Sequence, residues 1–147
     1  MNEQEYITER VDAQQKWYSK NSTKNKHYFI ILAIIEAVSA ILIPFVIVVS
    51  ELYSFPDKII VSLLGIITAI SIAISSLNKF QENWVQYRTT SEQLKHEKYL
   101  FLTHTRPYNQ DNAFQIYVER NELIISTENS KWLEIVENRE LTENTES

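Results

Sequence analysis

A chain of 147 residues with 14 basic and 19 acidic side chains is long enough for one ordinary domain and carries a net charge of −5. Phosphate recognition needs a clustered excess of Lys and Arg, so we expect no nucleic-acid partner. The absence of cysteine excludes a disulfide framework and a thiolate metal site. One glycine and three prolines exclude glycine-rich phosphate loops and predict an all-α protein rather than a turn-rich β architecture.

The charges are segregated along the chain. Residues 1–27 carry five basic and four acidic side chains, and residues 78–147 carry eight basic and twelve acidic ones. The central stretch, residues 28–77, holds only four charged side chains: Glu36, Glu51, Asp57 and Lys58. The near-neutral mean hydropathy therefore conceals a strongly apolar central third.

Two apolar segments lie in this central stretch. Residues 28–49 contain one charge in 22 residues, and residues 59–77 contain none in 19. Each spans roughly 30 Å as a helix, which is the thickness of a bilayer's hydrocarbon core. Both are apolar on every side, whereas core helices of soluble proteins are apolar on one stripe. We therefore predict an integral membrane helical hairpin, with residues 50–58 as its external turn.

Basic residues flank the hairpin on the side of both termini. Five precede the first segment and four follow the second, namely Arg10, Lys16, Lys20, Lys24, Lys26, Lys79, Arg88, Lys95 and Lys98, whereas the turn offers only Lys58. The positive-inside rule therefore predicts that both termini are cytoplasmic. No targeting sequence precedes the first segment, and we expect a multi-pass protein of the bacterial inner (cytoplasmic) membrane.

The residues on either side of the hairpin have apolar positions at helical spacing. This pattern predicts long helices that extend from the membrane segments into a cytoplasmic helical bundle. We expect residues 1–27 to form an N-terminal helix, residues 78–139 to form further helices and residues 140–147 to be a flexible tail. An a/d coiled-coil seam follows the second segment, and it predicts one helix from about Asp57 to Thr103. The predicted assembly and core residues are Trp17, Phe80, Trp84, Tyr87, Leu94, Phe101, Phe114 and Trp132.

Five motifs in the arms have a recognisable order and spacing: ERVxxQxxWY at 9–18, KFQENWVQYR at 79–88, ExLKxEKYLF at 92–101, FxxYVER at 114–120 and STENSxW at 126–132. Together with a Glu inside the first apolar segment, they resemble the bacterial SLATT-like two-transmembrane family, which includes a sub-branch catalogued as a domain of unknown function. The resemblance covers nearly the whole chain. It implies a pore-forming effector of the kind described beside nucleotide-second-messenger systems in bacterial defence. No fused nucleotide-sensing or enzymatic domain accompanies it here, so a stand-alone channel is equally consistent.

Glu36 is the charge within the first apolar segment. An ionised carboxylate at such a depth costs about 3 kcal/mol or more, so Glu36 is expected to face protein or water. It is either a protonated side chain bonded to a neighbouring helix or an ion site in a pore. Two helices alone cannot shield it, and both interpretations therefore require an oligomer.

Further polar residues offer two interpretations each. Thr68, Ser71, Ser75 and Asn78 share one helix face with Gly65, which is typical either of close helix packing or of a pore lining. Glu51 and Asp57 flank the turn. In a symmetric oligomer they would form rings of carboxylates that attract cations, whereas in a monomer they are solvated turn charges.

No pattern of residues indicates an active site. His27, His96 and His104 are spread over different predicted regions, and one histidine near one carboxylate does not make a metal site. We expect no enzyme activity, no cofactor and no metal. The sequence favours a homo-oligomer of roughly four to six copies that passes cations through a membrane pore. The alternative is a non-conducting anchor or scaffold that binds a protein partner, for example as a defence-system effector.

Overall fold

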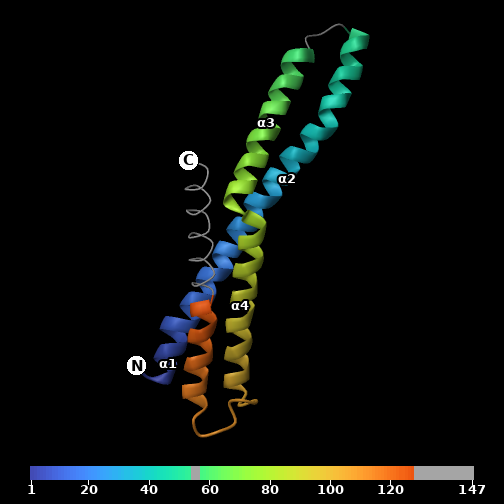
Figure 1. Ribbon diagram of the computed structural model, residues 1–147. Helices are drawn as coiled ribbons and strands as arrows, with labels where there is room; N and C mark the ends of the chain where they lie inside the picture. Colours follow the sequence, from blue (N-terminus) through green and yellow to red (C-terminus); the bar gives the residue numbers. More distant parts are fainter. Residues whose placement is uncertain (54–56, 128–147) are drawn as a thin grey trace, which may run out of the picture. The chain divides into compact units, whose positions relative to one another are not determined.

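The computed structural model describes residues 1–53 and 57–127, with the side chain of Leu52 excepted, and this part of the chain is helical without any strand (Figure 1). The elements are α1 (Glu3–Glu5), the π-helical segment η1 (Tyr6–Asp12), α2 (Ala13–Tyr53), α3 (Asp57–Asn78), α4 (Phe80–Leu102) and a last helix described over residues 113–127. The predicted all-α class is confirmed. Trp132 and the predicted tail at 140–147 lie outside the described residues.

The chain divides into two compact units. One comprises Met1–Lys20 with Tyr87–Ser147, and the other comprises Asn21–Gln86. The first contains three helical stretches, from the N-terminal helix, from α4 and from residues 113–127, and we call it the bundle. The second contains α3 with the later part of α2, and we call it the hairpin (Figure 1). The boundaries between the units fall inside α2 and α4.

The bundle begins with a capping box. The side chain of Asn2 accepts a hydrogen bond from the backbone N–H of Glu5 at 2.8 Å, and the Glu5 carboxylate accepts one from the N–H of Asn2 at 3.0 Å. Two N–H groups that the first helical turn leaves free are thereby paired. The helix then buries Tyr6, Ile7 and Val11 along η1. The N-terminal arm therefore contributes directly to the bundle core.

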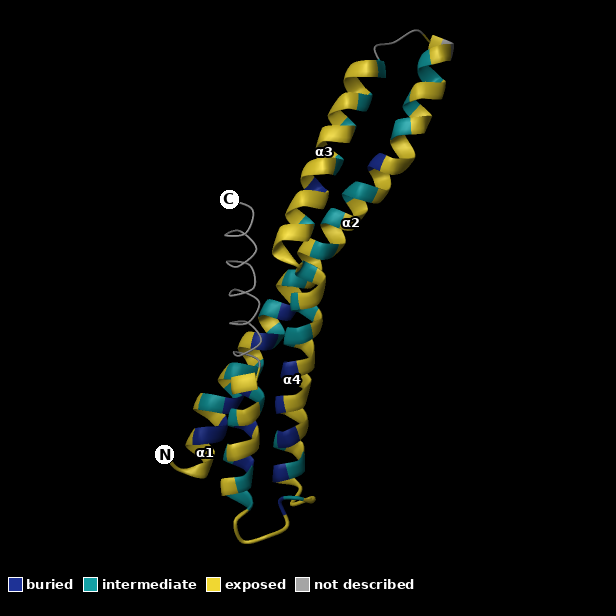
Figure 2. Ribbon diagram, in the orientation of Figure 1, coloured by how far each residue is buried: buried dark blue, intermediate teal, exposed yellow. Residues whose placement is uncertain are grey.

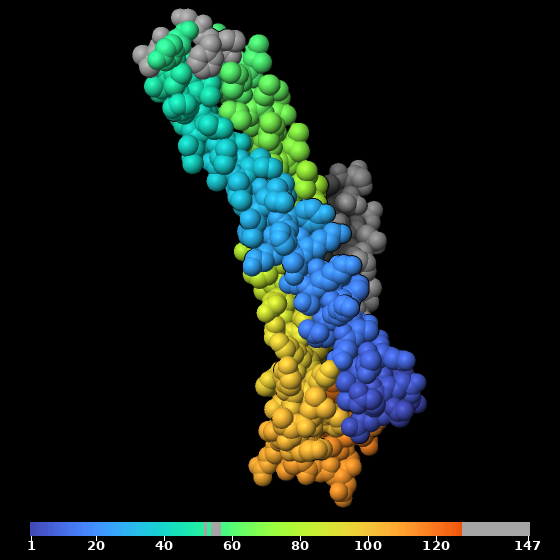
Figure 3. All heavy atoms as spheres, turned by 180° about the vertical axis from the view of Figure 1, so that it is seen from behind, coloured from blue at the N-terminus to red at the C-terminus, as the bar shows by residue number. Residues whose placement is uncertain are grey.

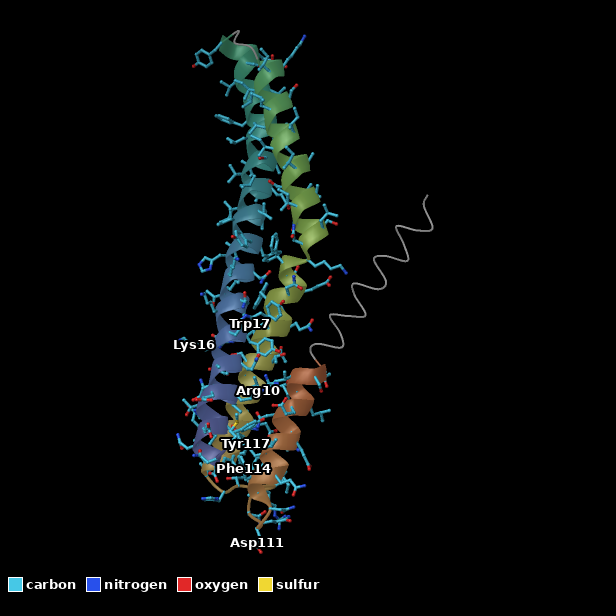
Figure 4. All side chains as sticks on the ribbon, turned by 90° about the vertical axis from the view of Figure 1, so that its left-hand side faces the viewer. Arg10, Lys16, Trp17, Asp111, Phe114 and Tyr117 are labelled. Atoms are coloured by element: carbon cyan, nitrogen blue, oxygen red, sulfur yellow. The ribbon has the colours of Figure 1, made fainter. Side chains whose placement is uncertain are left out.

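The bundle core is aromatic. Its buried residues come from all three helices and from the connection that follows α4: Tyr6, Ile7, Val11, Tyr18, Leu94, Phe101, Tyr108, Tyr117 and Ile125. The rings of Phe101 and Tyr117 stack with centroids 4.3 Å apart, and Phe114 lies beside them on the same helix as Tyr117 (Figure 4). Such pairs contribute roughly 0.5–1.5 kcal/mol beyond their buried area. Stacked rings therefore fix the register of α4 against the last helix.

One ion pair joins each two of the three helices in the bundle. The pairs are Arg10–Glu122, Asp12–Lys98 and Glu97–Arg120, with N–O distances of 2.8, 2.6 and 2.6 Å. The Arg10 guanidinium binds both oxygens of Glu122, and the hydrogen bonds from Arg10 lower the pKa of that carboxyl. Each pair lies next to the aromatic core. The three together fasten every helix to both of its neighbours.

Glu97 is the most buried member of these pairs, with 6% of its surface exposed. The Arg120 guanidinium donates two hydrogen bonds to its carboxylate, at 2.6 and 3.0 Å, and the Tyr108 hydroxyl donates another. Burial by itself would raise the pKa of Glu97, but the hydrogen bonds from Arg120 and Tyr108 outweigh it, so that the pKa is lowered. Burial and the bond to Glu97 raise the pKa of Tyr108, so its phenol remains a donor.

The sequence predicted one continuous helix from about Asp57 to Thr103, and this prediction is wrong at one residue, where the helix is interrupted. Lys79 separates α3 from α4 and has φ 47°, a left-handed conformation that costs a non-glycine residue about 1–2 kcal/mol. The Asn83 side-chain amide donates to the carbonyl of Asn78 at 2.9 Å, which gives that carbonyl a partner at the break. The two helices remain consecutive, since the N–H of Lys79 donates to the carbonyl of Ser75 and the N–H of Asn83 donates to that of Lys79.

Acid should weaken the bundle because the pKa values of Glu97 and Glu122 are lowered on folding. A lowered carboxyl pKa adds stability above the unfolded value of about 4.3, and this stability is lost as the pH falls below it. The near-ultraviolet circular dichroism of the stacked tyrosines should therefore decrease below about pH 4.5.

Arg120→Gln tests the same carboxylate. It leaves Glu97 buried without its cation, so it should cost about 3 kcal/mol and move the loss of signal to higher pH. Exchanging the exposed partner of a surface pair, Arg88→Gln, should leave the profile unchanged. An Arg120→Gln profile identical to that of the native chain would contradict the assignment.

Candidate functional site

The two helices of the hairpin face each other along a regular seam. The half-buried and buried positions of α2 from residue 29 onward follow a three- or four-residue spacing, at Phe29, Leu32, Glu36, Ser39, Ile43, Val46 and Ser50, with Ile35 and Val49 half-buried beside two of them. Those of α3 do the same, at Asp57, Val61, Leu64, Thr68, Ser71 and Ser75. This spacing is typical of antiparallel helices that pack side by side, as Figures 1 and 3 show.

Serines are the most buried residues of this seam. Ser39 and Ser71 are the buried residues of the apolar segments, at 3% and 4% exposure. Both stand 16 residues from position 55, so they lie at the same level of the two antiparallel helices. Figure 2 shows one dark-blue turn on each helix at this level. Small side chains let two helix backbones approach closely, which favours packing as the role of these hydroxyls.

The outer surface of the hairpin is apolar. Only 6% of the most apolar window of each long helix is buried, and both helices are long and apolar enough to cross a membrane. The exposed side chains include Ile34, Ile41, Phe45, Ile66 and Ile70 (Figure 2). The fully buried residues of the bundle are mostly large and apolar, whereas those of the two apolar segments of the hairpin are Ser39 and Ser71, and many large apolar side chains of these segments are exposed. The polarity of the hairpin is therefore the reverse of that of a soluble helix pair.

A polar groove interrupts the hairpin where α3 meets α4. Its volume is about 410 Å³, and it is lined by Phe29, Glu36, Ile72, Ser75, Ser76, Lys79, Phe80, Gln81 and Glu82. The break at Lys79 brings the start of α4 into its wall. Glu36 is half-buried here and shares the groove with two serine hydroxyls and one ammonium group. The carboxylate expected to face protein or water therefore lies in a polar recess.

The charges around the groove form a small set. Lys79 Nζ lies 3.6 Å from a Glu82 carboxylate oxygen, which is a loose pair. Next to the groove, Lys24 lies over the ring of Tyr28 and Lys26 over the ring of Trp84, each 5.9 Å from the ring centroid. Lys24 and Lys26 are exposed. Beside the groove, the ammonium groups of Lys24 and Lys26 therefore each contact an aromatic ring.

The structure distributes the other predicted site residues over several places. Thr68, Ser71 and Ser75 face α2, and the Thr68 hydroxyl donates to the carbonyl of Leu64 at 2.8 Å. Asn78 is exposed and its amide donates to the carbonyl of Ile74. Beside the turn, Glu51 is exposed and Asp57 is half-buried. Glu36 and Ser75 are the predicted residues that meet in the groove.

The predicted assembly and core residues divide between the bundle and the hairpin. In the bundle Leu94 and Phe101 are buried, Tyr87 and Phe114 pack against them, and Trp17 is half exposed beside Tyr18 and Tyr87 (Figure 4). In the hairpin, the rings of Phe80 and Tyr28 lie tilted to each other with centroids 5.3 Å apart. The backbone carbonyl of Trp84 accepts a hydrogen bond from the Ser22 hydroxyl.

Sequence reasoning missed Lys79, Gln81 and Glu82, which line the same groove as Glu36. Their place in the groove depends on the left-handed Lys79, and a lysine gives no signal for that conformation. Among the residues that the structure describes, no group of three or more His, Asp or Glu side chains could hold a metal ion.

Ser39→Leu should destabilise the hairpin because it adds bulk where the two helices are closest. We expect a loss of about 1–3 kcal/mol, measured as a lower thermal midpoint of the helical circular dichroism of the purified chain. Ala37→Leu is the matched control, since Ala37 is exposed two residues away. Equal midpoints for the two variants would contradict the close contact at Ser39.

In a comparison with protein families, residues 13–115 match a family described as a protein of unknown function, DUF4231. The match covers 103 of the 147 residues, and the chain belongs to this family. No curated protein and no solved structure matches significantly. The matched range contains the hairpin and the whole groove, and it ends before the Arg120 and Glu122 ion pairs. The groove is therefore part of what the family model covers.

Proposed function

We propose that the chain crosses a bacterial inner membrane as a helical hairpin, with both ends in the cytoplasm, and that several copies form a cation-conducting pore. The reversed polarity of the hairpin supports the insertion, because lipid tails can cover its apolar outer surface and water cannot do so without a large cost. Away from its ends and from Pro44, the helix backbone pairs its own N–H and C=O groups, as a membrane interior requires.

The distribution of ammonium groups supports the proposed orientation. Lys24, Lys26 and Lys79 lie at the end of the hairpin that carries the chain's two arms, and Lys58 is the basic residue at the opposite end. Basic residues concentrate on the cytoplasmic side of membrane helices. The aromatic rings beneath Lys24 and Lys26 suit the boundary between hydrocarbon and headgroups. The bundle would then stand in the cytoplasm.

An exposed stripe of small residues on α3 supports assembly with further copies. It consists of Ser62, Gly65, Ala69, Ala73 and Ser76. Gly65 is the single glycine of the chain, and a methyl group added to it would meet nothing within 4 Å. A glycine inside a helix costs about 1 kcal/mol relative to alanine. Close approach of a helix from another copy would compensate for that cost.

The polar groove at Glu36 is the observation that carries the pore proposal. A carboxylate in an otherwise apolar hairpin marks a path for ions or protons by default, and here it opens into a recess. In an assembly of several copies, Glu36 would stand at the inner mouth, and the exposed Glu51 with Asp57 would form the rings at the outer mouth. Thr68, Ser71 and Ser75 face α2, so we assign them to packing. The resemblance to the SLATT-like family of predicted pore formers agrees with this assignment.

Cation flux into liposomes tests the pore. The native chain should carry K⁺ faster than Cl⁻. Glu51→Gln and Glu36→Gln should each reduce the cation flux roughly ten-fold or more, because each copy in the assembly loses one carboxylate. Glu92→Gln, which removes an exposed carboxylate of the bundle, should leave the flux unchanged. Flux no higher than that of empty liposomes under every gradient would end the pore proposal and favour a membrane anchor or scaffold.

Cysteine labelling tests the orientation, and the chain has no cysteine of its own. Lys58→Cys, at the turn end of α3, should react with a membrane-impermeant maleimide added to whole cells. Thr105→Cys, in the exposed connection after α4, should react only after the membrane is opened. The reverse pattern would overturn the proposed orientation, and labelling of both in whole cells would overturn the hairpin.

A further inference from the structure

The groove at Glu36 contains both signs of charge within one recess. Two carboxylates, Glu36 and Glu82, share it with the Lys79 ammonium group, and the hydroxyls of Ser75 and Ser76 lie between apolar walls. Lys79 is held only loosely by Glu82, at 3.6 Å, so its donors are available to another acceptor. A ligand that matches this set carries an anionic and a cationic group close together.

The groove also lies against a surface that is apolar and exposed. Ile72 belongs to its lining, and Ile74 and Leu77 are exposed on the adjoining turns of α3. From Phe29 to Glu36 the groove follows α2 for seven residues, roughly 10 Å along the helix axis. This length exceeds the headgroup layer of one leaflet, which is about 5–7.5 Å thick. The recess therefore begins where the apolar surface ends and continues along it.

We propose that this groove binds the headgroup of a phospholipid that carries a primary ammonium group beside its phosphate. The phosphate would accept hydrogen bonds from Lys79, and the ammonium group would donate to the carboxylates of Glu36 and Glu82. The acyl chains would follow the exposed isoleucines of α3. This arrangement neutralises Glu36 without a further protein chain. It rests on membrane insertion of the hairpin and not on conduction.

Simpler ligands fit the recess less well. A lone cation would meet the positive charge of Lys79 between the two carboxylates, and an anionic headgroup would meet Glu36 and Glu82. A choline headgroup has the right charges, but its quaternary nitrogen has no N–H to donate. The volume of about 410 Å³ leaves room for a phosphate and an amine together. The charge pattern therefore selects an ethanolamine-type headgroup.

Native mass spectrometry of the purified chain in detergent tests the proposal. The probes are phosphatidylethanolamine, phosphatidylcholine and phosphatidylglycerol with identical acyl chains, each at the same concentration. The native chain should retain phosphatidylethanolamine roughly ten-fold more than either other lipid, as expected for charge-assisted hydrogen bonds. Glycerophosphoethanolamine, the soluble headgroup, should not displace it. Displacement at equal concentration would show a soluble zwitterion as the ligand and overturn the lipid assignment.

Removing the negative and the positive charges of the groove one at a time tests whether the lipid binds there. Glu36→Gln should abolish the preference for phosphatidylethanolamine while leaving phosphatidylglycerol binding equal or stronger. Lys79→Gln should weaken binding of all three lipids. A variant that merely unfolds would lose all binding and helical circular dichroism together, and Glu82→Gln then provides the second test of the same preference.

Controls carry the same charge changes outside the groove. Lys58→Gln matches Lys79→Gln, and Glu92→Gln matches Glu36→Gln. Both should bind lipid as the native chain does. Equal retention of the three lipids by the native chain, or an unchanged preference in Glu36→Gln, would overturn the proposal. Because the readout is binding, absence of ion flux would leave it standing.

Discussion

Most of the apolar surface of the hairpin is left uncovered by the chain itself, and the other features of the molecule depend on this constraint. Of the described residues between 28 and 77, twenty large apolar side chains are exposed. A half-exposed side chain of this size forfeits about 1 kcal/mol in water. The sum exceeds the 5–15 kcal/mol by which a folded domain is normally stable. Lipid tails around a membrane-inserted hairpin would remove this cost, and the buried residues of the two apolar segments, Ser39 and Ser71, are polar.

The bundle, unlike the hairpin, buries its large apolar side chains within the chain itself. Its aromatic side chains are buried against each other, and its charged side chains are paired around them. Glu97 shows how the two are combined, since its carboxylate is almost fully buried yet accepts bonds from both Arg120 and Tyr108. A buried pair of this kind contributes more to the choice of one arrangement than to net stability. The Glu97–Arg120 pair therefore restricts how α4 and the last helix can meet.

The sequence predicted what depends on composition and period, and it missed what depends on long-range geometry. The apolar segments at 28–49 and 59–77 fall within α2 and α3, because twenty consecutive apolar residues are a local signal. Glu97 and Arg120 lie 23 positions apart in different helices, and no local sequence pattern predicts that they pair. The break at Lys79 was missed because the flanking residues continue the helical period. Glu36 was singled out from the sequence as a charge in an apolar segment, but Lys79, Phe80, Gln81 and Glu82 in the same groove were not predicted beside it.

The serine seam also limits how the length of this chain can change during evolution. Ser39 and Ser71 are both buried, and equal numbers of residues separate them from position 55 in the turn. One residue inserted within α3 before Ser71 would rotate everything after it by about 100° and carry Ser71 and Ser75 onto the outer surface. Bulky isoleucines would then enter the tightest contact. Insertions and deletions in relatives should therefore be absent from the helical parts of the hairpin and confined to the segments that connect helices.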